Sequence, residues 1–172
     1  MGKPVFRCMG KKHSPRFLAT VEQSRAVIQE CDIDQFSAML SDGEDIVVID
    51  VRERHEYDAG CFEGALHLSK GVIERDIEKH PISEDARIVL YCGGGFRSAI
   101  AAESLTRMGY TNVYSLWGGW RSLVAVGLAC IYNCIQGSKA LRKAKLSRYY
   151  ISPANTVVSG ARRSEPPLRW QT

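Results

Sequence analysis

The chain has 172 residues, of which 45% are hydrophobic and 24% are charged. This is the composition of a globular protein and the length of one ordinary domain with extensions, so a wholly disordered or fibrous chain is excluded. The longest nearly apolar stretch, 123–132, has 10 residues. A membrane-spanning helix needs about 20, so we expect no membrane segment.

The net charge of +4 conceals an uneven distribution along the chain. Residues 1–30 carry 6 Lys and Arg against 2 Asp and Glu, residues 31–127 carry 9 against 16, and residues 128–172 carry 8 against 1. An acidic block between two basic segments favours one central domain. We therefore expect a basic N-terminal arm at 1–31, a domain at 32–127 and a basic, partly disordered C-terminal extension over the remainder.

The cysteines and the basic ends indicate which cellular compartment and which kinds of partner to expect. The six cysteines have irregular spacings, and the first residues lack the apolar core of a secretory signal, so we expect free thiols in the reducing cytoplasm. Cys130 and Cys134 lack C-x-x-C spacing and have no accompanying His pair, which argues against a metal site. Basic ends are more often solvated than bound to nucleic acid, so a nucleic-acid partner is not expected.

From residue 32 onward, helical and strand patterns alternate. Asp32 and Gln35 have the spacing of a capping box, and apolar residues then recur on one helical face as far as Gly43. A short β-branched run at 46–49 and three further short runs predict strands, and their alternation with helices predicts a parallel sheet. The expected strands are 46–49, 65–68, 88–91 and 113–116, and the further expected helices are 53–59, 71–78, 100–108 and 120–126. Beyond residue 127 we expect a basic helix over 137–148 and loop or disorder over 152–172.

The most informative segment is YCGGGFRS, residues 91–98. Cys92 stands at the carboxyl end of a predicted parallel strand, where ligands bind in open α/β sheets. The glycines at 93–95 allow the backbone to curl tightly and to point several N–H groups at one atom. Arg97 adds a positive charge, and Ser98 stands where the N-cap of the next helix is expected. Together these features favour an anion at the centre, which would be the nucleophilic thiolate of Cys92.

Other ligand-binding motifs do not fit the chain. The third glycine of a dinucleotide fingerprint would fall on Ser98, and the second histidine of a zinc-protease motif would fall on Ala59. No Gly-Lys-Ser/Thr sequence is present for a nucleoside-triphosphate loop. The loop after Cys92 is therefore the candidate site.

Several motifs in the right order resemble the rhodanese-like domains, which are sulfurtransferases. With the first predicted helix included, the resemblance covers residues 32–127. It implies an α/β fold in which a mostly parallel central sheet is flanked by helices on both faces. The motifs are Asp50-Val51-Arg52-Glu53, Gly64-Ala65, the loop at 91–98 and Leu116-Trp117-Gly118-Gly119.

The resemblance implies a two-step sulfur transfer through Cys92 as the catalytic residue. The thiolate attacks the outer sulfur of a donor such as thiosulfate, and the resulting persulfide gives that sulfur to cyanide or to a thiol, including a protein thiol. No metal or organic cofactor is implied. The loop residues that would bind the substrate and the persulfide are Gly93, Gly94, Gly95, Phe96, Arg97 and Ser98.

Loop length separates this chemistry from that of related enzymes. Four residues stand between Cys92 and Arg97, as in the sulfurtransferases, whereas the related dual-specificity phosphatases have five. This spacing favours sulfur transfer over a phosphatase or an arsenate reductase. A sulfur carrier or interaction module without turnover is the other alternative.

Three further residues have alternative roles. Asp50 and Arg52 would lie beside the active end of the sheet, where they could orient the loop, although a structural salt bridge between Arg52 and Glu56 is an equal alternative. Cys61 stands where the family usually has a histidine. It is either a plain substitution or a thiol that resolves the Cys92 persulfide into a disulfide.

Overall fold

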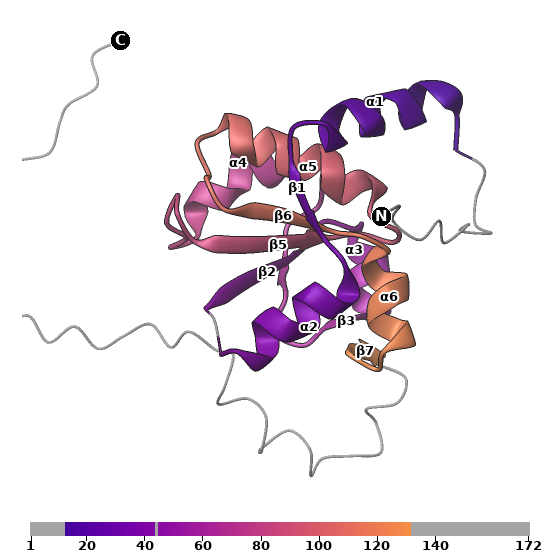
Figure 1. The fold of residues 1–172 in the computed structure, drawn as a ribbon, viewed down its shortest axis with the longest axis vertical. Helices are drawn as coiled ribbons and strands as arrows, with labels where there is room; N and C mark the ends of the chain where they lie inside the picture. The colour runs from indigo at the N-terminus through magenta and orange to yellow at the C-terminus, as the bar shows by residue number, and fades with distance from the viewer. Residues whose placement is uncertain (1–12, 44, 132–172) are drawn as a thin grey trace, which may run out of the picture.

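The computed structural model describes residues 13–43 and 45–131 (Figure 1). The expected helix at 137–148 and the expected disorder at 152–172 lie outside the described residues. Within the described ranges, no helix is both long and apolar enough to cross a membrane. The centre of the fold is a five-stranded parallel sheet in the order β1-β6-β5-β2-β4. Its strands are β1 (Gln29–Cys31), β2 (Ile46–Asp50), β4 (Leu66–His67), β5 (Arg87–Tyr91) and β6 (Val113–Leu116).

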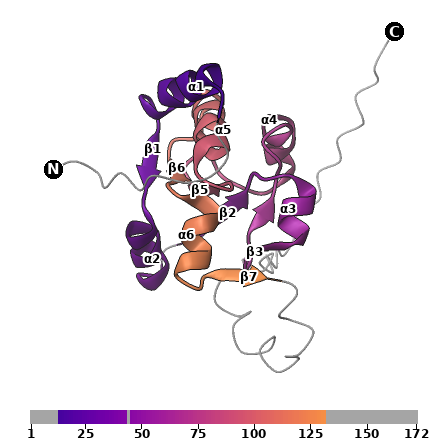
Figure 2. The same cartoon turned by 90° about the vertical axis from the view of Figure 1, so that its right-hand side faces the viewer.

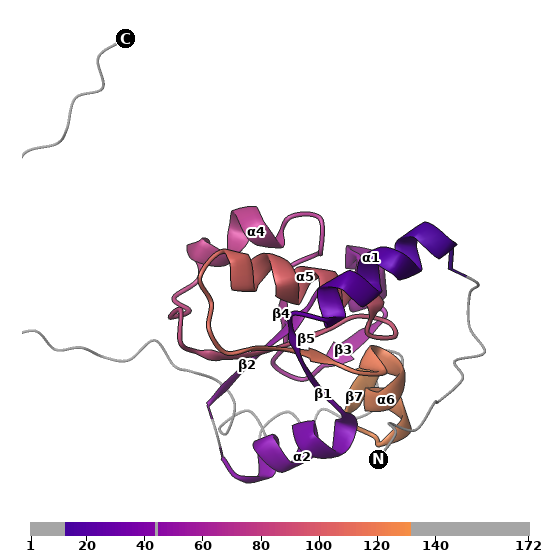
Figure 3. The same cartoon turned by 45° about the horizontal axis from the view of Figure 1, so that its top comes forward.

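Helices cover both faces of this sheet, which confirms the predicted α/β architecture. Figure 3 shows α1 (Pro15–Arg25), α4 (Ile73–Asp76) and α5 (Phe96–Arg107) on one face. The other face carries α2 (Ile33–Ser41) and α6 (Gly119–Ala125). The predicted helix at 71–78 is divided into α4 and a following 3₁₀ turn, η1 (Ile77–Lys79).

The two faces of the sheet have separate hydrophobic cores. Successive side chains of a strand point to opposite faces, so Ile88 and Leu90 of β5 pack beneath α5, whereas Val89 and Tyr91 pack on the side of α2 and α6. All four side chains are fully buried. A strand buried on both faces needs a continuous apolar run, which is the pattern that predicted it.

The capping box predicted for the first helix is present in α2. The backbone N–H of Gln35 donates to Asp32 Oδ1 at 2.8 Å, and the backbone N–H of Asp32 donates to Gln35 Oε1 at 3.0 Å. These two bonds satisfy backbone donors that the first helical turn would otherwise leave without partners.

Residues 15–31, which the charge pattern places in a basic arm, contain α1 and the edge strand β1. Helix α1 packs on α5, and the Ser24 hydroxyl donates to Glu103 Oε2 at 2.6 Å. Strand β1 pairs with β6. The helix has a largely polar sequence in which Val21 and Ser24 are the buried residues, so its apolar face gives almost no periodic signal.

A small second sheet joins two distant parts of the chain. It consists of β3 (Gly60–Phe62), which follows the short helix α3 (Arg54–Asp58), and β7 (Ala129–Ile131) in antiparallel pairing. Figure 2 shows these two strands together next to α6, at the end of the molecule away from α1. Neither strand was predicted, because a three-residue strand is too short to show an alternating pattern.

Candidate active site

Cys92 directly follows β5, the central strand of the sheet, and the loop after it leads into α5. Gly95 is the N-cap of this helix and has φ +90°, a left-handed conformation that favours glycine. A Cβ at this position would also lie 3.2 Å from the carbonyl oxygen of Leu116. The helix begins at Phe96, so Ser98 is its third residue, and the prediction that Ser98 provides the N-cap is wrong.

Two hydrogen-bond donors converge on the sulfur of Cys92. The Gly95 N–H donates to Sγ at 3.2 Å, and the Ser98 hydroxyl lies 3.7 Å from Sγ. Ser98 is fully buried and its hydroxyl is 2.9 Å from that of Ser115 on β6, which fixes its position. The Cys92 residue itself is 1% exposed. A backbone N–H at a helix N-terminus together with a hydroxyl can stabilise negative charge on this sulfur.

The turn after β6 packs tightly against Cys92. The Trp120 N–H donates to the Cys92 carbonyl oxygen at 2.6 Å. Gly119 has φ +51°, and a Cβ there would collide with the same carbonyl oxygen. Gly118 and Gly119 therefore allow the turn after β6 to lie against the backbone of the loop that follows β5.

We expect Gly119→Ala to destabilise the fold by about 3 kcal/mol or more, because a left-handed alanine and an overpacked contact each cost about 1–3 kcal/mol. Gly127 is the matched control, since it has φ +73° and open space around its Cβ position. Gly127→Ala should cost only the backbone strain, about 1 kcal/mol. Urea unfolding of the two variants measures the difference, and equal losses would contradict the tight packing at Cys92.

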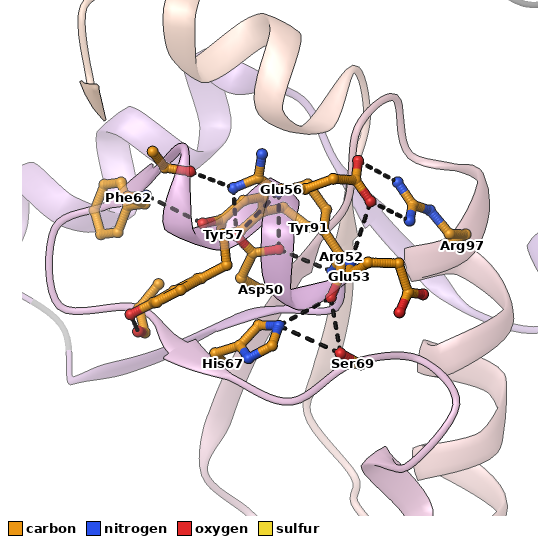
Figure 4. A network of polar contacts seen from close by, with 12 residues as sticks. Asp50, Arg52, Glu53, Glu56, Tyr57, Phe62, His67, Ser69, Tyr91 and Arg97 are labelled. Atoms are coloured by element: carbon orange, nitrogen blue, oxygen red, sulfur yellow. Dashed lines mark hydrogen bonds and ion pairs between the residues drawn. The ribbon is translucent and has the colours of Figure 1, made fainter. Parts of the chain in front are cut away.

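The guanidinium of Arg97 is held by Glu56 from α3 (Figure 4). Its two terminal nitrogens donate to the two carboxylate oxygens at 2.6 and 2.9 Å. The hydrogen bond from Arg97 is the largest of the effects that lower the pKa of Glu56 from 4.5 to about 2. The pKa of Arg97 is raised, chiefly by this hydrogen bond and also by the nearby Cys92.

Arg52 pairs with Asp50 and not with Glu56, so the alternative of an Arg52–Glu56 salt bridge is wrong. The Arg52 side chain donates to both oxygens of Asp50 at 2.6–3.0 Å and to the carbonyl oxygen of Gly60 at 2.6 Å. Its guanidinium also stacks over the Trp120 ring at 4.3 Å. Asp50 and Arg52 are 0% and 3% exposed. The Asp50–Arg52 pair thus supports Trp120, whose N–H donates to the Cys92 carbonyl oxygen.

An aromatic cluster that the sequence did not predict adjoins the loop. The His13 ring lies 4.6 Å from the Phe96 ring, and Phe17 of α1 packs against both. The guanidinium of Arg25 lies 4.2 Å from the Trp117 ring and 5.3 Å from the Phe96 ring. These side chains come from the N-terminal segment, from α5 and from the loop after β6, so no local sequence pattern connects them.

The other described cysteines occupy different positions. Cys31 ends β1, where burial is the main cause that raises the pKa of its thiol to about 12. Cys61 lies in β3, directly opposite Cys130 of β7 in the strand register. A resolving role for Cys61 stays a prediction.

Comparisons with known proteins agree with this arrangement. A model of the rhodanese-like domain matches residues 32–125. A sulfurtransferase of Allochromatium vinosum is 34% identical over 93 residues, which span 54% of this chain and 85% of that protein.

One further comparison matches only part of a relative, and another shows a likeness of the fold alone. A tRNA uridine(34) hydroxylase of Pectobacterium carotovorum is 36% identical over 90 residues. The match spans 50% of this chain and 25% of the hydroxylase, so the chain covers about a quarter of that relative's length. The solution structure of a rhodanese-like domain from Anabaena superimposes with a TM-score of 0.54 at 22% identity, over 83% of this chain and 94% of that domain. That likeness concerns the fold.

Proposed function

Because the chain belongs to the rhodanese-like domain family, we propose that it is a sulfurtransferase that works through a persulfide of Cys92. The donor is a small compound with a sulfane sulfur, such as thiosulfate, and the acceptor is cyanide in an assay or a thiol in the cell. The observation that carries the proposal is the pair of donors, Gly95 N–H and Ser98 hydroxyl, directed at the Cys92 sulfur.

The proposed reaction has two half-reactions. The Cys92 thiolate attacks the outer sulfur of thiosulfate, a new S–S bond forms, and the old S–S bond breaks with its electron pair leaving on sulfite. The acceptor thiolate or cyanide then attacks the outer sulfur of the persulfide and regenerates the Cys92 thiolate. In both steps the Gly95 N–H and the Ser98 hydroxyl are placed to stabilise charge on sulfur.

The four-residue interval between Cys92 and Arg97 supports sulfur over phosphate, because it is the interval of the family's sulfurtransferases, whereas the related phosphatases have five residues there. The tRNA uridine(34) hydroxylases match over a quarter of their length, so we do not extend their activity to this chain. We infer action in the cytoplasm from the irregular cysteine spacing, with no nucleic-acid or membrane partner.

The two-step mechanism predicts that thiosulfate alone releases sulfite in an amount equal to that of the protein. Continued release then requires cyanide or a thiol, and reciprocal plots of the steady-state rate are parallel. Sulfite assays with and without acceptor test this. One equivalent of sulfite without later turnover with either acceptor would favour the sulfur carrier, and sulfite formed only when an acceptor is present would contradict the persulfide mechanism.

A further inference from the structure

Three charged side chains lie against the loop after Cys92, and we call them the loop entrance: Glu56, Arg97 and Arg121. A Cβ on Gly93 would lie 3.5 Å from Arg97 Nη2 and 4.0 Å from Glu56 Oε1, so this ion pair lies against the first glycine of the loop. A Cβ on Gly94 would lie 3.7 Å from Nη1 of the exposed Arg121. A donor that binds at this loop therefore meets two cations and one carboxylate.

The carboxylate lowers the charge that the entrance offers to an anion. Glu56 accepts from both terminal nitrogens of Arg97 at 2.6 and 2.9 Å (Figure 4), so the charge of this guanidinium is largely compensated. Two further guanidinium groups near the loop have acidic partners: Arg52 pairs with the fully buried Asp50, and Arg25 pairs with Glu30 at 3.2 Å. The entrance thus has a formal charge of about +1 with Glu56 ionised and about +2 without it.

We propose that Glu56 is a specificity-determining residue that sets how much negative charge the sulfur donor can carry. The inference rests on the proposed function and adds to it a preference for donors with a single negative charge. Thiosulfate carries two negative charges, and the second is repelled by the Glu56 carboxylate. Between neighbouring charges in a partly exposed site, such repulsion amounts to roughly a tenfold change in an equilibrium constant.

The substitution Glu56→Gln changes this charge with little structural cost. Glu56 is the third residue of α3 and forms the capping box with Glu53, whose N–H donates to Glu56 Oε2 at 3.1 Å. Glutamine makes the same contact in capping boxes. Its amide oxygen can still accept one hydrogen bond from Arg97, so the guanidinium keeps a partner.

The test compares two donors that differ by one charge. Thiosulfate is a dianion, and methanethiosulfonate is a monoanion in which a methyl group replaces one oxygen. Each donates its terminal sulfur to Cys92, with sulfite leaving from the first and methanesulfinate from the second. In Glu56→Gln we expect kcat/KM for thiosulfate to rise about tenfold relative to kcat/KM for methanethiosulfonate, mainly through a lower KM.

Two further variants distinguish the effect of the Glu56 carboxylate next to Arg97 from a general effect of negative charge near the loop. Glu53→Gln removes the same charge from an exposed residue at the start of α3, and among the described residues Glu53 has no ion pair with Arg97. It should leave the ratio of the two kcat/KM values within about twofold. Glu56→Asp keeps the carboxylate and should keep the ratio closer to that of the unsubstituted protein than Glu56→Gln does.

An unchanged ratio in a Glu56→Gln variant that still forms the persulfide would overturn the role of Glu56 and leave the proposed function intact. An equal change in Glu53→Gln would also overturn it. If neither donor adds sulfur to Cys92 of the unsubstituted protein, the proposed function fails and this inference fails with it.

Discussion

Cys92→Ser is expected to lower the rate of thiocyanate formation from thiosulfate and cyanide by about 10³-fold or more. A serine hydroxyl is not ionised at neutral pH and cannot form a persulfide, so both half-reactions are lost. The fold should survive, because serine has nearly the same shape and its oxygen can accept from the Gly95 N–H and the Ser98 hydroxyl.

The matched control for this variant is Cys31→Ala, which removes another buried cysteine. Burial raises the pKa of the Cys31 thiol to about 12, so this group is protonated at neutral pH and should contribute nothing to transfer. Its loss should leave the transfer rate within about threefold, provided that the variant is folded by circular dichroism. Substantial activity in Cys92→Ser, above about a tenth of the original, would exclude Cys92 as the nucleophile.

Asp50→Asn is expected to lower the free energy of unfolding by about 3–5 kcal/mol. Arg52 is 3% exposed and donates to both oxygens of Asp50, so the neutral amide leaves its charge buried without a counter-ion. Because Arg52 also stacks on Trp120, whose N–H holds the Cys92 carbonyl, activity should fall as well.

Asp58→Asn is the control, because it breaks the same type of pair on the surface. Arg54 and Asp58 are 74% and 52% exposed, and exposed pairs of this kind contribute about 0.3–0.5 kcal/mol. Urea denaturation of the two variants compares them directly. Similar losses for both would mean that the Asp50–Arg52 pair does not support the end of the sheet.

The order of strand, loop and helix around Cys92 could be predicted because its signals are local. Cys92, the glycines at 93–95 and Arg97 lie within six consecutive residues, and the apolar run at 88–91 indicates the strand that they follow. The capping box of α2 was predictable for the same reason, since Asp32 and Gln35 satisfy each other within one turn.

The partners of the charged side chains could not be predicted, because they depend on how distant elements pack. Glu56 and Arg97 are 41 residues apart and meet because α3 and the start of α5 lie together at the end of the sheet. From sequence alone, Arg52 could reach Asp50 or Glu56 equally well. The N-cap was wrongly predicted at Ser98, because Gly95, in a left-handed conformation, provides the N-cap three residues earlier.

Elements with a weak or short pattern were also missed. Helix α1 exposes most of its side chains, and its contribution to the site appears only when Phe17 and Arg25 are seen next to Phe96. Strands β3 and β7 are three residues each and pair across most of the domain. Periodicity over so few residues is too weak to predict either strand.

The most direct measurement is mass spectrometry of the protein after treatment with thiosulfate and removal of the excess. We expect one added sulfur, about 32 Da, on the peptide that contains Cys92, and its loss when cyanide is added. The same peptide from Cys92→Ser should gain nothing. Sulfur found on Cys61 or Cys31 instead, or on no cysteine at all, would contradict transfer through Cys92.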